Sequence, residues 1–223
     1  MKAPILIATA LALAPLAAPA QQPIEMRGTI VHQAAGTGFP ERIGQFRRSN
    51  AARFDVEGRN LGASYNAALP GGRLLISVYI YPAGRVAASP GSGEAADVAR
   101  DTLCRREFEE VEQTIERTQP DARVIERGGA AAVPGAEPRL GYRTVYQLRT
   151  RFDGEVQPVR SEARLYCHVG GGWQVKYRAS SPVAVDAAGA IEAFVRQGPW
   201  PGRAPPPSAD ETVALSGPRT AAR

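Results

Sequence analysis

Several stretches of the chain alternate apolar and polar residues in the way that half-buried β-strands do. Residues 61–67, LGASYNA, alternate larger apolar positions with small or polar ones, which predicts a strand. The later run RLLISVYIYP is apolar on both faces as far as Pro82, so we expect a central strand at 73–81 with packing on both sides. A shorter strand is predicted at 122–127.

Between residues 92 and 119 the apolar period becomes that of a helix. Ser92 is a suitable N-cap and Pro120 ends the run, so one long helix is predicted here. A second helix is expected at 184–197. The long helix carries one buried stripe, with spacings of four, three and four residues, formed by Cys104, Phe108, Val111 and Ile115.

Two turn signals organise the C-terminal half into a three-stranded antiparallel meander. Asp-Gly at 153–154 is typical of a two-residue hairpin turn, and the three glycines at 170–172 suit a second hairpin loop. With these turns the apolar positions of all three strands coincide, as a sheet with a buried face requires. The resulting register predicts the cross-strand pairs Tyr142–Leu165 and Cys167–Val175.

The chain has two cysteines, Cys104 and Cys167. In an exported protein two cysteines most often form one disulfide. Cys104 lies on the buried stripe of the predicted helix, and Cys167 points to the apolar face of the meander, so we predict that they are bonded and that the helix packs across the meander. His168 is expected to point to the other side of the sheet, which disfavours a Cys–His catalytic pair.

The same register predicts a row of cations across the outer face of the meander, with Arg143, Arg164 and Arg178 side by side. Like charges directly opposite one another are unfavourable in a sheet, so such a row could bind an anion or an acidic partner. The alternative is that these side chains extend into solvent or pair with acids such as Glu162, and the frequency of exposed arginines in proteins favours it. The candidate residues for the anion or partner site are Arg139, Arg143, Arg164, Tyr166, His168, Lys176 and Arg178.

The two ends of the chain differ in composition from the predicted domain. Residues 1–20 combine a basic start, a short apolar run and a small-x-small site, which is typical of a signal peptide. Residues 21–38 are interpreted as a leader, in which MRGTIVHQ, with His32, is a candidate strand and AAGTG a flexible joint, and 39–197 as a single domain. The Pro-, Ala- and Gly-rich stretch 198–223 is expected to be a disordered tail. We therefore expect an exported protein, periplasmic or secreted, without a membrane span in its mature form.

Charge and motifs disfavour several classes of function. The formal net charge is +5, but arginines are scattered along the chain, so nucleic-acid binding is not expected. The sequence has no HExxH, GxSxG, P-loop or strand-following GxGxxG motif. The acidic residues of the long helix suit an exposed, ion-paired face better than a metal site, so no metal or cofactor is predicted. The stretch FRRSNAARFDVEGR is interpreted as a polar connection, in which Asp55 and Glu57 are candidates for hydrolase chemistry by residue type.

The order of elements, together with SVYIYP and WQVKYR, is similar to that of the PsbP-like domains. The resemblance covers about residues 39–197 and implies an α+β fold, in which a twisted, mainly antiparallel sheet of about six or seven strands carries one long central helix and a C-terminal helix. Domains of this family generally act as binding or assembly modules. We therefore expect a non-enzymatic exported accessory or binding domain that engages an anionic ligand or an acidic protein. Two alternatives stay open: a hydrolase using carboxylate or His168 chemistry, and an envelope protein that binds through its Pro-rich tail.

Overall fold

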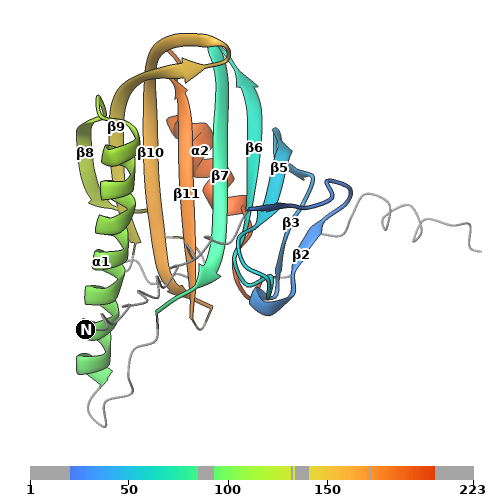
Figure 1. Cartoon of the computed structure of the whole chain (residues 1–223), viewed down its shortest axis with the longest axis vertical. Coiled ribbons are helices and arrows are strands. Elements are labelled where there is room, and N and C mark those ends of the chain that lie inside the picture. The colour runs from blue at the N-terminus through green and yellow to red at the C-terminus, as the bar shows by residue number, and fades with distance from the viewer. Residues whose placement is uncertain (1–20, 85–92, 132, 134–140, 171, 204–223) are drawn as a thin grey trace, which may run out of the picture.

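The computed structural model describes residues 21–84, 93–131, 133, 141–170 and 172–203. Within this part the chain folds into a large antiparallel sheet with one long helix and one C-terminal helix, which confirms the predicted α+β class (Figure 1). The signal peptide predicted at 1–20, the candidate residue Arg139 and the end of the predicted tail at 204–223 lie outside the described residues.

The elements have the following bounds. The strands are β1 (Gln22–Pro23), β2 (Ile30–His32), β3 (Thr37–Phe39), β4 (Arg42–Ile43), β5 (Phe46–Arg53), β6 (Leu61–Leu69), β7 (Gly72–Pro82), β8 (Arg123–Gly129), β9 (Gly141–Phe152), β10 (Glu155–Val169) and β11 (Trp173–Pro182). The helices are α1 (Gly93–Thr118), α2 (Ala188–Gln197) and the short 3-10 helix η1 (Gln33–Ala35). In the described part, nine strands form the main sheet in the order β1-β5-β6-β7-β11-β10-β9-β8, with β4 beside β5, while β2 and β3 pair separately.

The helices α1 and α2 lie on opposite faces of this sheet (Figure 1). α1 packs over β9 and β10 through a small apolar cluster that includes Phe108 and Leu165. α2 packs on the other face, where the ring of Phe194 lies 4.8 Å from that of Phe46 and 5.2 Å from that of Tyr65. In Figure 1 no described helix covers the α1-side face of β11, β7 and β6.

Several elements lie where local pattern predicted them. α1 matches the helix expected at 92–119, and β7 matches the strand expected at 73–81. β9 and β10 form the predicted hairpin, in which Tyr142 lies opposite Leu165. No helix of the described part combines the length and the apolar composition that a membrane crossing needs.

Cys104 and Cys167 form the predicted disulfide. Their Cα atoms are 5.8 Å apart, and both side chains are buried. The bond joins α1 to β10, so the long helix is held to the meander by a covalent link as well as by apolar packing.

The second hairpin differs from the predicted register by one residue. Tyr166, and not Cys167, lies opposite Val175. The cause is a β-bulge in β10 between Tyr166 and Val169, which adds one residue to that strand relative to β11. His168 lies within the bulge with φ of 54°, a left-handed conformation that histidine adopts more readily than most residues.

The bulge changes which face of the sheet the residues of β11 occupy. Because side chains alternate along a strand, a shift of one residue moves every side chain to the opposite face. Lys176 lies opposite Leu165, and Arg178 lies opposite Ala163. Both cations therefore lie on the α1 side of the sheet, and the prediction that Arg178 shares a face with Arg164 is wrong.

Residues 21–38, expected to be a leader, contribute strands to the fold and are anchored by a buried arginine. The guanidinium of Arg48 donates hydrogen bonds to the backbone carbonyls of Phe39, Met26 and Gly28, the last two at 2.7 Å. The side chain is 6% exposed, so these carbonyls replace the water that it loses. Arg48 thereby fastens the N-terminal segment to β5.

The core also continues past residue 197, where the tail was expected to begin. Trp200 is 2% exposed, and its indole N–H donates to the carbonyl of Val195 at 2.8 Å. Its ring centroid lies 5.1 Å from that of Tyr166 and 5.7 Å from that of Tyr177. The chain after α2 therefore closes the α2-side core.

His32, which was assigned to the leader, is fully buried at the end of β2. Its Nδ1 accepts a hydrogen bond from the backbone N–H of Ala35, which caps η1, and its Nε2 lies 3.1 Å from the carbonyl of Arg59. The ring packs edge-on against Trp173 at a centroid distance of 4.9 Å. An imidazole that accepts at Nδ1 and donates at Nε2 is neutral, so this arrangement favours the uncharged form.

We expect the protein to lose stability as the pH falls below about 6.5, because burial lowers the pKa of His32 below its ordinary value. The unfolded chain then binds a proton that the folded protein does not. The free energy of unfolding therefore falls by up to about 1.4 kcal/mol for each pH unit. The change to test is His32→Asn, since asparagine is also a good N-cap acceptor but does not titrate. Urea unfolding at about pH 7.5 and 5.5 should show a smaller loss for the variant. Equal losses in both proteins would contradict a role for His32.

Candidate anion-binding groove

The structure divides the predicted cationic row between the two faces of the sheet. Arg143, Arg164 and Tyr166 lie on the α2 side, whereas Lys176 and Arg178 lie on the α1 side. The prediction of one continuous basic row across three strands is therefore wrong. The two groups have different surroundings, and these decide which of them can bind an anion.

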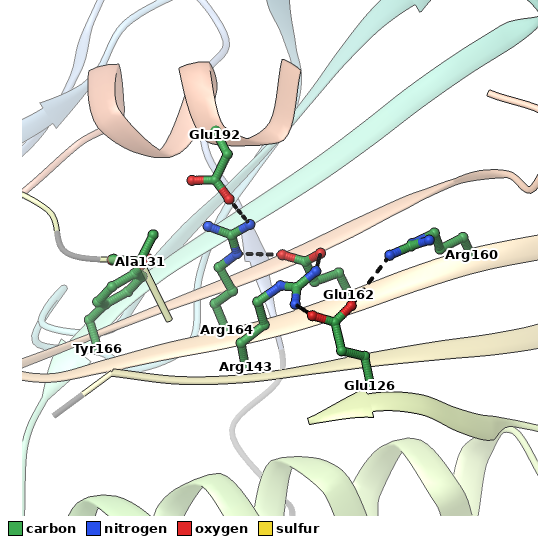
Figure 2. Close-up of polar contacts among 8 residues, drawn as sticks. All are labelled: Glu126, Ala131, Arg143, Arg160, Glu162, Arg164, Tyr166 and Glu192. Carbon is green, nitrogen blue, oxygen red and sulfur yellow. Dashed lines mark hydrogen bonds and ion pairs between the residues drawn. The ribbon is translucent and has the colours of Figure 1, made fainter. Parts of the chain in front are cut away.

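On the α2 side the arginines are paired with glutamates in a chain of ion pairs (Figure 2). Arg164 contacts Glu162 through Nε and Glu192 of α2 through Nη2, the latter at 2.5 Å. Arg143 also contacts Glu162, at 2.9 Å, and reaches Glu126 of β8. This is the alternative that the sequence left open, in which the arginines pair with acids such as Glu162.

Burial and charge together fix the ionisation of this cluster. Arg164 is 2% exposed, and burial by itself would lower its pKa, but the hydrogen bond to Glu192 and the charge of Glu162 outweigh it and raise the pKa. The hydrogen bond from Arg164 lowers the pKa of Glu192. Both partners therefore stay charged, and the arginines have little positive charge left for a ligand.

The other two described candidates for the anion site, Tyr166 and His168, lie in the α2-side core and in the bulge of β10. The hydroxyl of Tyr166 donates to the carbonyl of Ala131 at 3.2 Å, and its ring packs in the α2-side core. His168 is partly buried within the bulge of β10. Neither lies beside Lys176 in the lining of the groove described below.

Lys176 is a partly buried cation between aromatic rings. Its Nζ lies 4.9 Å from the ring centroid of Tyr79, its cross-strand partner on β7, and 5.6 Å from that of Tyr81. Such contacts with aromatic faces stabilise an ammonium group but do not neutralise it. Burial lowers the pKa of Lys176, and the charge of Glu107 offsets part of that effect.

Arg178 lies two residues along β11, on the same face. Its Nη2 donates to the hydroxyl of Ser161 at 3.3 Å, whereas its buried Nε has no hydrogen-bond partner within the described part of the chain. Burial lowers the pKa of Arg178. Among the described residues no carboxylate oxygen lies within 4.0 Å of the side-chain nitrogens of Arg178 or Lys176.

The two cations line a groove of about 280 Å³ between the open sheet face and the flank of α1. We call it the Lys176 groove. The sheet forms one wall and α1 forms the other. The four lining residues of α1 are spaced three, one and three residues apart, which places them on one face of the helix. Its lining residues are Tyr79, Lys176 and Arg178 on the sheet, and Glu107, Glu110, Val111 and Thr114 on α1.

The helix wall of the Lys176 groove is acidic. Glu107 accepts a hydrogen bond from the hydroxyl of Tyr81 at 2.9 Å, which fixes the carboxylate beside the sheet. Burial raises the pKa of the Tyr81 phenol, and the charge of Glu107 raises it further, so the phenol stays protonated and keeps donating. Glu110 is more exposed and lies 3.9 Å from Arg106, also on α1. The groove thus has a cationic wall and an anionic wall.

The sequence did not indicate Tyr79 or the α1 residues of this groove. The acidic residues of the helix were predicted to form an exposed, ion-paired face. The exposed Arg106–Glu110 pair agrees with this prediction along one edge of α1. The groove depends on the bulge in β10, because only the shifted register turns Lys176 and Arg178 toward the helix.

The residues considered for hydrolase chemistry are not arranged as a pair of catalytic carboxylates. Asp55 and Glu57 lie in a turn after β5 and not on a strand, and Asp55 Oδ1 accepts the backbone N–H of Arg59 at 2.9 Å, which closes the turn. No group of three or more His, Cys, Asp or Glu side chains in the described residues is placed to hold a metal ion.

Comparison of the chain with protein-family models, curated proteins and solved structures found no match. The function must therefore be inferred from the site itself.

Proposed function

We propose that this protein is a non-enzymatic binding domain that takes an anionic ligand in the Lys176 groove. The observation that carries the proposal is the pair of partly buried cations, Lys176 and Arg178, that have no carboxylate within 4.0 Å in the described part. A charge removed from water without a counter-ion is costly, so an anion that enters the groove gains more than it would at an exposed arginine. The arginines of the α2 side, which already have glutamate partners, offer no such gain.

The proposal includes export to the periplasm or the medium, in an accessory role. It is supported by the signal-peptide pattern of residues 1–20 and by the Cys104–Cys167 disulfide, since disulfides persist mainly in oxidising compartments. The resemblance to PsbP-like domains agrees with a binding role and stays a prediction.

The test is a titration of the mature protein with two simple anions, N-acetylglycine and inorganic phosphate, followed by calorimetry or NMR. The double variant Lys176→Gln/Arg178→Gln should bind both at least about tenfold more weakly, because each charged hydrogen bond is worth about 1.5–3 kcal/mol. The matched control is Arg47→Gln, which removes a charge from an exposed position of β5 on the same sheet face.

The control should bind like the wild type. The proposal is wrong if the wild type binds neither anion, or if the double variant, shown to be folded, binds both as tightly as the wild type does.

A further inference from the structure

The Lys176 groove has a second property that a site for a plain anion does not need. Across from Lys176 and Arg178, its helix wall presents Glu107 and Glu110. A simple anion in this groove would be attracted by one wall and repelled by the other. The acidic wall therefore lowers the affinity for an anion while creating a place for a cation.

The position of Glu107 is fixed by a hydrogen bond to the sheet. Glu107 is held by the hydroxyl of Tyr81 at 2.9 Å, and Tyr81 is itself on the central strand β7. One carboxylate oxygen of Glu107 accepts this hydrogen bond, which leaves the other oxygen available as an acceptor. Lys176, which could swing to Glu107, instead lies over the rings of Tyr79 and Tyr81.

From this charge arrangement we propose that the ligand is a small zwitterion, with a carboxylate at Lys176 and Arg178 and an ammonium group at Glu107 and Glu110. A free amino acid or a dipeptide has this chemistry. The inference rests on the proposed function, because it adds a second charge to an anion that the same groove binds.

Size agrees with a small ligand. Pockets for drug-sized molecules measure about 300–1,000 Å³, and the groove, at about 280 Å³, lies just below that range. Val111 and Thr114, also on the helix wall, add an apolar side chain and a hydroxyl group to the lining. A ligand with charged ends and a short linker therefore fits better than a long acidic chain.

The experiment compares glycylglycine, which carries both charges, with N-acetylglycine, which keeps the carboxylate and lacks the ammonium group. Wild-type protein should bind glycylglycine at least about tenfold more tightly, which corresponds to about one charged hydrogen bond. The variant Glu107→Gln/Glu110→Gln should lose this preference. Its affinity for N-acetylglycine should rise or stay the same, because the repulsive wall is gone while glutamine still accepts the hydrogen bond from Tyr81.

The control for the helix is Glu109→Gln, which removes the same charge from an exposed position of α1 outside the groove and should keep the wild-type preference. Equal affinity of the wild type for both probes would overturn the zwitterion inference. So would a result in which Glu107→Gln/Glu110→Gln changes the affinity for both probes by the same factor. In those cases weaker binding of N-acetylglycine to Lys176→Gln/Arg178→Gln would still support the proposed function. If the wild type binds neither probe, the inference fails, and if it also fails to bind phosphate, so does the proposed function.

Discussion

Replacing both cysteines with alanine is expected to lower the free energy of unfolding by about 4 kcal/mol. The bond joins residues 63 apart in the sequence. In the chain-entropy model, closing a loop of that length lowers the conformational entropy of the unfolded chain and so raises its free energy by about 4 kcal/mol. A domain of this size is stabilised by about 5–15 kcal/mol, so the loss is a large fraction of the total. Urea unfolding followed by tryptophan fluorescence measures the change.

Reduction provides the matched control. Wild-type protein should lose about the same free energy of unfolding on addition of a thiol reductant, whereas the Cys104→Ala/Cys167→Ala variant should not respond. A change of less than about 1 kcal/mol in the variant would mean that the apolar cluster under α1 positions the helix without help from the bond.

Local pattern was enough to predict the elements whose burial follows a simple period. The stripe of α1, the continuous apolar run of β7 and the Asp-Gly turn between β9 and β10 each involve few residues close in sequence. The disulfide followed from two such patterns, since Cys104 lies on the stripe and Cys167 on the inner face of β10.

β5 could not be predicted in this way because its burial depends on distant contacts. Arg48 is buried in this strand, and it donates to carbonyls 22 and 20 residues away at Met26 and Gly28, as well as to the carbonyl of Phe39. A bulge between Arg48 and Asn50 also interrupts the alternation. A buried charge and a broken period together make the strand look like a polar connection.

The candidate site was missed for a related reason. The sequence identified Lys176 and Arg178 as part of a basic site, but a regular register placed Arg178 beside Arg164 instead of on the α1 side. The bulge at His168 is one residue long, and no pattern in the sequence indicates it before the strands are paired. A single unpredicted residue thus decided which cations form ion pairs with glutamates on the α2 side and which line the Lys176 groove.

The arginine cluster on the α2 side provides the second large expected effect. Replacing Arg164 with methionine should lower the free energy of unfolding by about 3 kcal/mol, because Glu162 and Glu192 lose a buried partner. We expect the lower end of the usual 3–5 kcal/mol range, since Arg143 still contacts Glu162. Methionine is an unbranched side chain of similar volume, so loss of packing is a smaller part of the effect. Urea unfolding at neutral pH measures it.

The control Arg149→Met makes the same change at an exposed position of β9 and should stay within about 0.5 kcal/mol of the wild type. Removing the acid as well, in Arg164→Met/Glu162→Gln, should be less costly than the sum of the two single changes, because neither charge is then left buried without its partner. Additive losses would show that the two side chains do not stabilise each other. Coupling of about 1 kcal/mol or more would instead show that Glu162 neutralises Arg164, which leaves Lys176 and Arg178 as the cations available to an anion.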